Sequence, residues 1–224
     1  MAAIIQSYWS MLLGALGKTL LLTLLSLFFA MIIGMIFALM NVGRSRVCNC
    51  IGTIYVDAVR GVPLIVLAYF IYFGVPAGIK MMGIQDFRLS ALQAGTIALS
   101  MNCGAYMAEI IRAGIKSVDK GQMEAGRSLG LNKFQTMRYI IIPQAFKSIL
   151  PPLGNEFIVL IKETSIVGYV GMSDLTRVAN QMTSKLFDVF TPLLGIAFIY
   201  FVLTKVLSIL LAKLERRLRK SDNR

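Results

Sequence analysis

The sequence has 224 residues, of which 57% are hydrophobic and only 15% charged, and its mean hydropathy is +0.72. A soluble domain carries about 25% charged residues, so this composition indicates an integral membrane protein. The net charge of +12 does not indicate nucleic-acid binding, because the basic residues lie between and after the apolar runs. The absence of histidine excludes Ser-His-Asp and Cys-His relays and any histidine-containing metal site. Cys48, Cys50 and Cys103 are too few for a structural zinc site and are interpreted as packing residues.

The N-terminal segment 1–17 contains Tyr8 and Trp9 and no arginine or lysine. Amphipathic aromatic residues beside a span are typical of the membrane interface, so we expect an interfacial N-terminal segment. A signal peptide is not expected, because its basic beginning is missing. Gly17-Lys18-Thr19 resembles the end of a P-loop, but Leu12 stands where that motif requires glycine. The chain is therefore not expected to bind ATP through this motif.

Five apolar runs predict an all-α integral membrane protein with five transmembrane helices, since a span needs about 20 residues. These runs are 19–40, 60–75, 90–111, 143–161 and 187–211. The second begins at Arg60-Gly61-Val62-Pro63-Leu64, and the fourth is expected to be broken at Pro151-Pro152. We expect a polar hairpin at 76–88 and an irregular segment at 164–184.

Basic residues divide unequally between the two sides that five spans define. One side carries Arg44, Arg46, Arg112, Lys116, Lys120, Arg127, Lys133, Arg138, Lys213, Arg216, Arg217, Arg219, Lys220 and Arg224. The other side carries Lys80, Arg88, Lys162, Arg177 and Lys185. The positive-inside rule then predicts an outside N-terminus and a basic cytoplasmic tail at 213–224 that also contacts anionic lipid.

The stretch 124–143, EAGRSLGLNKFQTMRYIIIP, is too polar and too short to cross a membrane as two helices. Residues 124–129 are mostly good helix formers, and Gly130 permits the left-handed turn that ends a helix. Asn132 is expected to cap a second helix, and Pro143 to limit how far that helix runs unkinked. We therefore expect a pair of short surface helices that docks on another protein.

The spacing of Glu124-Ala125-Gly126, Gly130, Ile140 and Ile142-Pro143 resembles the signature loop of ATP-binding-cassette (ABC) importer permeases. That signature reads EAA, three residues, G, nine residues, I, one residue, LP, so this chain departs from it at Gly126 and Ile142. Glycine at 126 lowers helix stability by about 1 kcal/mol relative to alanine. The sequence continues through Pro143-Gln144-Ala145, Pro151, Asn155 and Lys162-Glu163-Thr164-Ser165, which is similar to the polar amino-acid permeases of the histidine, glutamine, glutamate, arginine and opine group.

This resemblance implies a type I ABC importer permease fold in one domain, which forms the translocation pathway as a dimer with an identical or homologous protomer. It implies that segment 113–142 is a cytoplasmic coupling-helix loop. A separate ATPase subunit, which binds ATP and Mg, would dock at Glu124, Ala125, Gly126, Gly130 and Leu131. The chain itself would be a transport subunit and not an enzyme, without a cofactor of its own. The resemblance also implies an extracytoplasmic amino-acid-binding protein as a partner and the bacterial inner membrane as the location.

Ionisable residues inside a membrane cost about 2.5–3.5 kcal/mol each, which makes them candidates for function. Glu156 follows Pro151-Pro152, where a helix backbone opens, and it shares a helical face with Leu160 and Glu163. Asn102, Tyr106 and Glu109 are spaced i, i+4, i+7 and share a face of the preceding span. The substrate-binding hypothesis therefore comprises Asn102, Tyr106, Glu156, Lys162 and Glu163.

Each of these residues also has a structural interpretation. Asn102 and Tyr106 would then only join helices, Glu109 and Arg112 would pair at a helix end, and Lys162 and Glu163 would be a solvated surface pair. Gly95, Gly104 and Ala105 are interpreted as helix-packing positions.

An alternative function is an ion-coupled secondary carrier or channel that uses Glu156 and Lys162 as a relay. Such a carrier has no use for a coupling helix, so segment 124–143 favours the importer. No sequence feature supports a third class, a membrane scaffold without transport.

Overall fold

The computed structural model describes residues 2–43 and 45–220, and all the regular elements in this part of the chain are helical. The elements are α1 (Ala2–Val42), α2 (Arg46–Gly61), α3 (Leu64–Tyr69), η1 (Phe70–Gly74), α4 (Val75–Met81), α5 (Ala91–Lys116), α6 (Lys120–Ser128), α7 (Lys133–Thr136), η2 (Met137–Ile141), α8 (Ile142–Glu163), η3 (Thr164–Val170), α9 (Leu175–Leu186) and α10 (Phe190–Lys220). Residues 2–17, predicted as a separate interfacial segment, continue into the first span as one helix.

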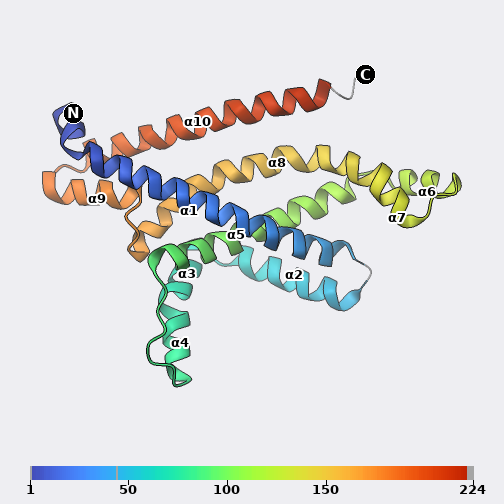
Figure 1. Ribbon diagram of the computed structural model, residues 1–224, viewed down its shortest axis with the longest axis horizontal. Helices are drawn as coiled ribbons and strands as arrows, with labels where there is room; N and C mark the ends of the chain where they lie inside the picture. Colours follow the sequence, from blue (N-terminus) through green and yellow to red (C-terminus); the bar gives the residue numbers. More distant parts are fainter. Residues whose placement is uncertain (1, 44, 221–224) are drawn as a thin grey trace.

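The centre of the molecule is the packing of α5 against α1 on one side and α8 on the other (Figure 1). Small residues let α1 and α5 approach closely: a Cβ on Gly34 would lie 2.7 Å from Cβ of Met107, and one on Gly104 would lie 2.8 Å from Cγ2 of Ile33. A Cβ on Gly95 would lie 2.5 Å from Cγ1 of Val167. The predicted packing positions Gly95 and Gly104 therefore hold the helices together by close contact, as membrane helices commonly do.

Helix α2 was not predicted, since residues 46–61 were taken for loop and the start of a span. The hydroxyl of Ser45 caps it by accepting from the backbone N–H of Cys48, and Gly52, Val56 and Val59 bury one face. Tyr55 ties α2 to α5 by donating to the carbonyl of Met101 at 2.9 Å. The signal was present in the sequence as a serine cap followed by an apolar stripe of helical spacing.

The arm formed by α3, η1 and α4 extends away from the bundle to one side (Figure 1). It is helical from Leu64 to Met81, so the polar hairpin predicted from residue 76 begins later, after Met81. Pro76 lies in the first turn of α4, directly after the π-helical turn η1, where the missing N–H costs little. Pro143 occupies the equivalent place after η2 at the start of α8.

The expectation that α8 is broken at Pro151-Pro152 is wrong. Both prolines lie inside one helix that runs from Ile142 to Glu163. The two prolines remove backbone donors, yet the helix is held in place by packing against α5 through Ala145, Ile149 and Leu160, which are buried. Tertiary packing here outweighs the cost of proline in a helix.

The end of the molecule that holds the N-terminus also contains η3, α9 and the start of α10 (Figure 1). Segment 164–184 was predicted to be irregular, but it forms η3 and the regular helix α9. The carboxylate of Asp174 caps α9 by accepting from the N–H groups of Thr176 at 3.1 Å and Arg177 at 3.0 Å. Asp188 caps α10 in the same way, so this helix begins at Phe190, three residues later than predicted.

Three described helical stretches are long and apolar enough to cross a membrane by length and composition: Tyr8–Val42, Leu64–Met81 and Phe190–Arg216. The helices α5 and α8, predicted as the third and fourth spans, are too polar to meet the same criterion. The all-α fold is confirmed, while the count of five spans stays a prediction. The basic tail continues α10 as far as Lys220, and the rest of the predicted tail lies outside the described residues.

Candidate functional site

We call Asn102 and Tyr106 on α5, together with Glu156 and Glu163 on α8, the central polar cluster. The amide of Asn102 donates to a carboxylate oxygen of Glu163 over 3.4 Å. Asn102 is 4% exposed and Glu156 8% exposed, so both lie inside the protein. Helical periodicity brings these residues together, because each pair is separated by whole turns along its own helix. All five residues predicted to bind substrate lie on these two facing helices, and four of them belong to the cluster.

Glu156 points into the interface with α5, where its carboxylate lies within side-chain hydrogen-bonding reach of the thiol of Cys103. Leu160, one turn further along, is fully buried in the main core. The face of α8 that carries Glu156, Leu160 and Glu163 is therefore turned toward protein and away from lipid. This agrees with the high cost of exposing carboxylates to hydrocarbon.

Arg60, which was not among the predicted site residues, extends the cluster. Its guanidinium carbon lies 4.8 Å from the centroid of the Tyr106 ring, a cation–π contact between the end of α2 and α5. Arg60 is also close enough to Glu156 for an electrostatic interaction. The signal in the sequence was an arginine standing immediately before the Gly-Val-Pro-Leu that opens an apolar run.

Lys162 does not join the central polar cluster. Its side chain is exposed and lines a different pocket, which is formed with Tyr169, Thr176 and Tyr200 around η3, α9 and α10. Adjacent residues of a helix point about 100° apart, so Lys162 and Glu163 face different neighbours. Within the described part of the chain, no group of three or more Asp, Glu, Cys or His side chains could hold a metal ion.

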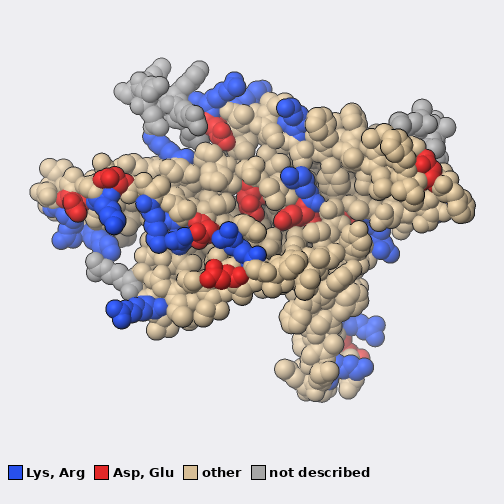
Figure 2. Space-filling view, turned by 180° about the vertical axis from the view of Figure 1, so that it is seen from behind, with Lys and Arg blue, Asp and Glu red and all other residues tan. Residues whose placement is uncertain are grey.

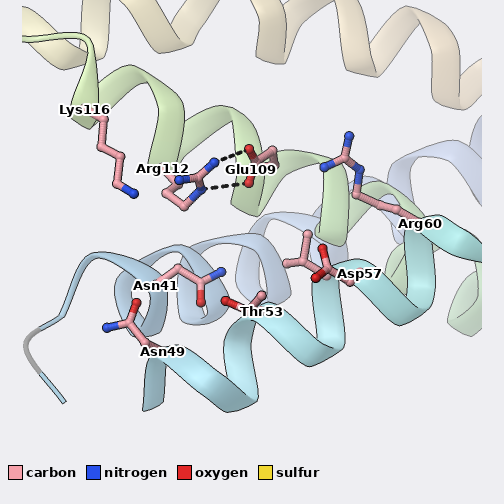
Figure 3. A pocket seen from close by; sticks show the side chains of 9 residues that line it. Asn41, Asn49, Thr53, Asp57, Arg60, Glu109, Arg112 and Lys116 are labelled. Atoms are coloured by element: carbon pink, nitrogen blue, oxygen red, sulfur yellow. Dashed lines mark hydrogen bonds and ion pairs between the residues drawn. The ribbon is translucent and has the colours of Figure 1, made fainter. Parts of the chain in front are cut away.

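Glu109 and Arg112 form the predicted pair at the end of α5. Nε of Arg112 donates to Glu109 at 2.8 Å, and the second guanidinium nitrogen completes a two-pronged ion pair. The two residues border a polar cavity between α1, α2 and α5 (Figure 3). Glu109 therefore has Arg112 as its partner, while Asn102, two turns earlier on the same side of α5, donates to Glu163.

The coupling segment, defined as residues 120–141, has the two short helices that the sequence predicts. Gly130 ends α6 with φ +83°, and the N–H groups of Gly130 and Leu131 donate to the carbonyls of Arg127 and Gly126 at 3.1 Å each. This is a Schellman motif, which needs a residue that tolerates positive φ. Asn132 and Gln135 then cap α7 reciprocally.

Gly126 is buried where α6 meets α7 and η2. A Cβ at this position would lie 2.5 Å from Cγ2 and 3.0 Å from Oγ1 of Thr136, which is fully buried. Gly126, where the signature has alanine, is thus required because the branched side chain of Thr136 across the turn leaves no room for a methyl group. Glu124, Ala125 and Gly130 are exposed, and Leu131 is half-buried.

Comparison with known proteins identifies the family. Residues 30–220 match the model of the binding-protein-dependent transport system inner membrane component. The chain belongs to this family. The permease GlnM of Bacillus subtilis strain 168, described as a glutamine ABC transporter permease protein, is 41% identical over 220 residues, with 98% of each chain covered. The glutamine transport system permease protein GlnP of Escherichia coli K12 is 35% identical over 201 residues, with 90% of each chain covered.

Solved structures agree with this membership. A chain from a crystal structure of an amino acid ABC transporter with histidines is 43% identical, has a TM-score of 0.87, and is matched over 95% of this chain and 96% of that chain. A chain of the MetNI methionine ABC transporter in an inward-facing form is 20% identical with a TM-score of 0.76, over 94% and 97% of the chains. The latter likeness concerns the fold alone.

Membership of this permease family confirms the predicted fold class and the prediction of a transport subunit of an ABC importer that is not itself an enzyme. The alternative of an ion-coupled secondary carrier loses its support, because ABC importers are driven by a separate ATPase. The relay proposed for that alternative also fails structurally, since Lys162 and Glu156 line different parts of the molecule.

Proposed function

We propose that this chain and a second permease protomer, identical or homologous, form the membrane pathway of an ATP-driven importer of polar amino acids. The family membership and the relatives that are named for glutamine support this proposal. The central polar cluster offers partners for the zwitterionic head group that all amino acids share, so the proposal names the substrate class and not one amino acid.

The observation that carries the proposal is the central polar cluster, where a buried carboxylate, an amide and an arginine converge between α5 and α8. An α-amino acid presents an ammonium and a carboxylate. Glu156 and Glu163 offer acceptors for the ammonium, while Arg60 and the amide of Asn102 offer donors for the carboxylate. Buried groups that exchange hydrogen bonds with a ligand confer specificity, because they remain unpaired when a wrong ligand binds.

The ATPase is proposed to dock on the coupling segment. Large apolar side chains stand exposed there, with Leu129 81%, Phe134 70% and Tyr139 65% exposed. A cluster of exposed aromatic and aliphatic groups on short helices is typical of a helix that fits a groove in a partner. Glu124 and Ala125 lie on the exposed side of α6 beside them. ATP and Mg are bound by the partner.

The coupling segment is proposed to face the cytoplasm, with the N-terminus outside the bacterial inner membrane. On the face seen in Figure 2, charged side chains gather over the end of the molecule that carries α6 and α7, and the opposite end is largely uncharged. This distribution suits the positive-inside rule. The opposite end, with α9 and the start of α10, would then receive the amino acid from an extracytoplasmic binding protein.

A direct test combines the permease with its ATPase in lipid vesicles. Vesicles with ATP inside and amino acid outside, or the reverse, report the direction of transport. We expect uptake of a polar amino acid that requires ATP on the coupling-segment side and the binding protein on the other. Uptake that is driven by an ion gradient without ATP would contradict the proposal.

A further inference from the structure

A second polar site lies between α1, α2 and α5, on the coupling-segment side of the central polar cluster. This cavity, which we call the lower cavity, has a volume of about 290 Å³. This volume lies just below the roughly 300–1,000 Å³ of typical ligand pockets, so only a molecule as small as an amino acid would fit. Asn41 contributes from α1, Thr53 from α2 and Lys116 from α5, and their side chains converge on one space (Figure 3).

The charges of the lower cavity are only partly neutralised within the protein. Glu109 and Arg112 satisfy each other as an ion pair. Arg60 and Lys116 interact electrostatically with Glu109 as well, but neither of them, nor Asp57, forms a direct ion pair with a described residue. All three side chains are exposed, so a ligand that enters the cavity can reach them. The lower cavity therefore offers one anion and two cations to whatever enters it.

Asn41 supplies a second, independent sign of a ligand. It is 8% exposed and lines the lower cavity, and its Oδ1 atom has no hydrogen-bond partner among the described residues. Gly52 leaves the room for this amide, since a Cβ there would lie 2.2 Å from Oδ1 of Asn41. A buried amide without a partner costs free energy unless a ligand or water completes its hydrogen bonds.

Arg60 belongs to both sites. It lines the lower cavity and at the same time covers the ring of Tyr106 in the central polar cluster. Asp57 lies three residues before Arg60 on α2, so the two charges share one face of the helix about one turn apart. Figure 3 shows them together at one end of the lower cavity, with Lys116 at the other end. A carboxylate next to a guanidinium matches the ammonium and carboxylate of an amino acid.

We propose that the lower cavity is a second binding site for a zwitterionic amino acid, which Asp57 and Arg60 hold by its head group while Asn41 meets its side chain. This inference rests on the proposed function for the identity of the cargo. The carboxylate of the amino acid stays with Arg60, and its ammonium passes from the glutamates of α8 to Asp57. Each protomer then binds the amino acid first at the central polar cluster and next in the lower cavity.

Cysteine protection tests the lower cavity in the assembled transporter. The variant Thr53→Cys is made with Cys48→Ser and Cys50→Ser, because Thr53 lines the cavity and Cys103 is fully buried. Its rate of modification by an anionic methanethiosulfonate is measured with and without saturating L-glutamine, L-glutamate or L-arginine. At least one of these amino acids is expected to slow modification about tenfold, and to do so equally in the Glu156→Gln background.

Asp57→Asn is expected to raise the half-protecting concentration about tenfold, since it removes one charge-assisted contact. Asp86→Asn makes the same change on an exposed loop and is expected to leave that concentration unchanged. The second site would be contradicted if Glu156→Gln abolished the protection and Asp57→Asn left it intact. It would also be contradicted if the Thr53→Cys protein transported its amino acid but no amino acid protected the cysteine. Protection without any ATP-driven uptake would support the site and contradict the proposed function instead.

Discussion

Gly126 shows how one residue of the coupling segment is fixed by its contact with another. Alanine is the better helix former by about 1 kcal/mol, but the added methyl would lie 2.5 Å from Cγ2 of the buried Thr136. Thr136 is β-branched and cannot easily turn away. Overpacking typically costs about 1–3 kcal/mol, so the contact outweighs the gain in propensity.

We therefore expect Gly126→Ala to lower the stability of the permease–ATPase complex by about 1–2 kcal/mol. The double variant Gly126→Ala with Thr136→Ser removes the methyl that clashes and is expected to recover most of the loss. Thermal unfolding of the purified complex measures both. A stabilised single variant would mean that Thr136 moves freely and that the contact does not determine residue 126.

Asp174 and Asp188 cap neighbouring helices but respond to pH in opposite directions. Burial raises the pKa of the Asp174 carboxyl, in spite of the backbone N–H groups that bind it. The side-chain hydrogen bond from Thr191 holds the pKa of the exposed Asp188 below its usual value. A raised pKa contributes stability at low pH that is lost as pH rises through the folded-state value, and a lowered pKa does the reverse.

Comparison of Asp174→Asn and Asp188→Asn with the parent protein tests this between about pH 2.5 and pH 7, because the lowered pKa of Asp188 places its loss of stability mostly below pH 4. As pH falls, the parent is expected to gain stability relative to Asp174→Asn and to lose stability relative to Asp188→Asn. Melting temperatures of the detergent-solubilised complex supply the measurement. Two differences that move in the same direction with pH would contradict the assignment of burial as the dominant cause at Asp174.

The coupling segment depends on the turn between α6 and α7. Gly130 has φ +83°, which L-residues other than asparagine and aspartate rarely adopt. A β-branched residue there would open the Schellman motif and misplace Leu129 and Phe134 on the exposed surface. The consequence belongs to docking and not to the transmembrane core, because nothing lies within 4 Å of a Cβ built on Gly130.

Gly130→Val is expected to abolish substrate-stimulated ATP hydrolysis and uptake while the permease still folds. Gly130→Asn, which tolerates positive φ, is expected to keep a large part of both activities. Gly78→Val places the same side chain in open space on α4 and serves as the control. Full substrate-stimulated ATP hydrolysis and uptake in Gly130→Val would contradict a role of this turn in docking.

Short-range signals made the two helices of the coupling segment predictable from sequence. Asn132 caps α7 and Gly130 adopts the positive φ that ends α6, and both effects depend only on neighbouring residues in the sequence. Long-range packing was harder to predict. The continuity of α8 through Pro151 and Pro152 depends on its buried contacts with α5, which no local rule contains. Arg60 was missed for the same reason, because its partner Tyr106 lies on another helix.

The whole molecule places three different surfaces along one bundle: the coupling segment at one end, α9 with the start of α10 at the other, and the central polar cluster between them (Figure 1). The arm formed by α3, η1 and α4 extends to the side with Phe70 63% and Phe73 57% exposed. Lipid or a second protomer must cover such an apolar surface.

The orientation of the bundle is tested by labelling single cysteines from either side of sealed vesicles, in a background that lacks Cys48 and Cys50. Asp86→Cys in the loop after the arm and Ser128→Cys at the end of α6 both stand at exposed positions. We expect an impermeant reagent to reach Asp86→Cys from outside and Ser128→Cys only from the cytoplasmic side. Labelling of both variants from one side would contradict the proposed topology.

The central claim is that Glu156 binds the transported amino acid. The most direct measurement is the affinity of the purified permease–ATPase complex for its amino acid, compared between the parent, Glu156→Gln and the control Glu215→Gln on α10. Glu156→Gln keeps the size of the side chain and removes one charge-assisted contact, so it is expected to weaken binding by about 1.5–3 kcal/mol, or about tenfold or more. Glu215→Gln is expected to change nothing. Unchanged affinity and uptake in a well-folded Glu156→Gln complex, across all amino acids tested, would contradict the account.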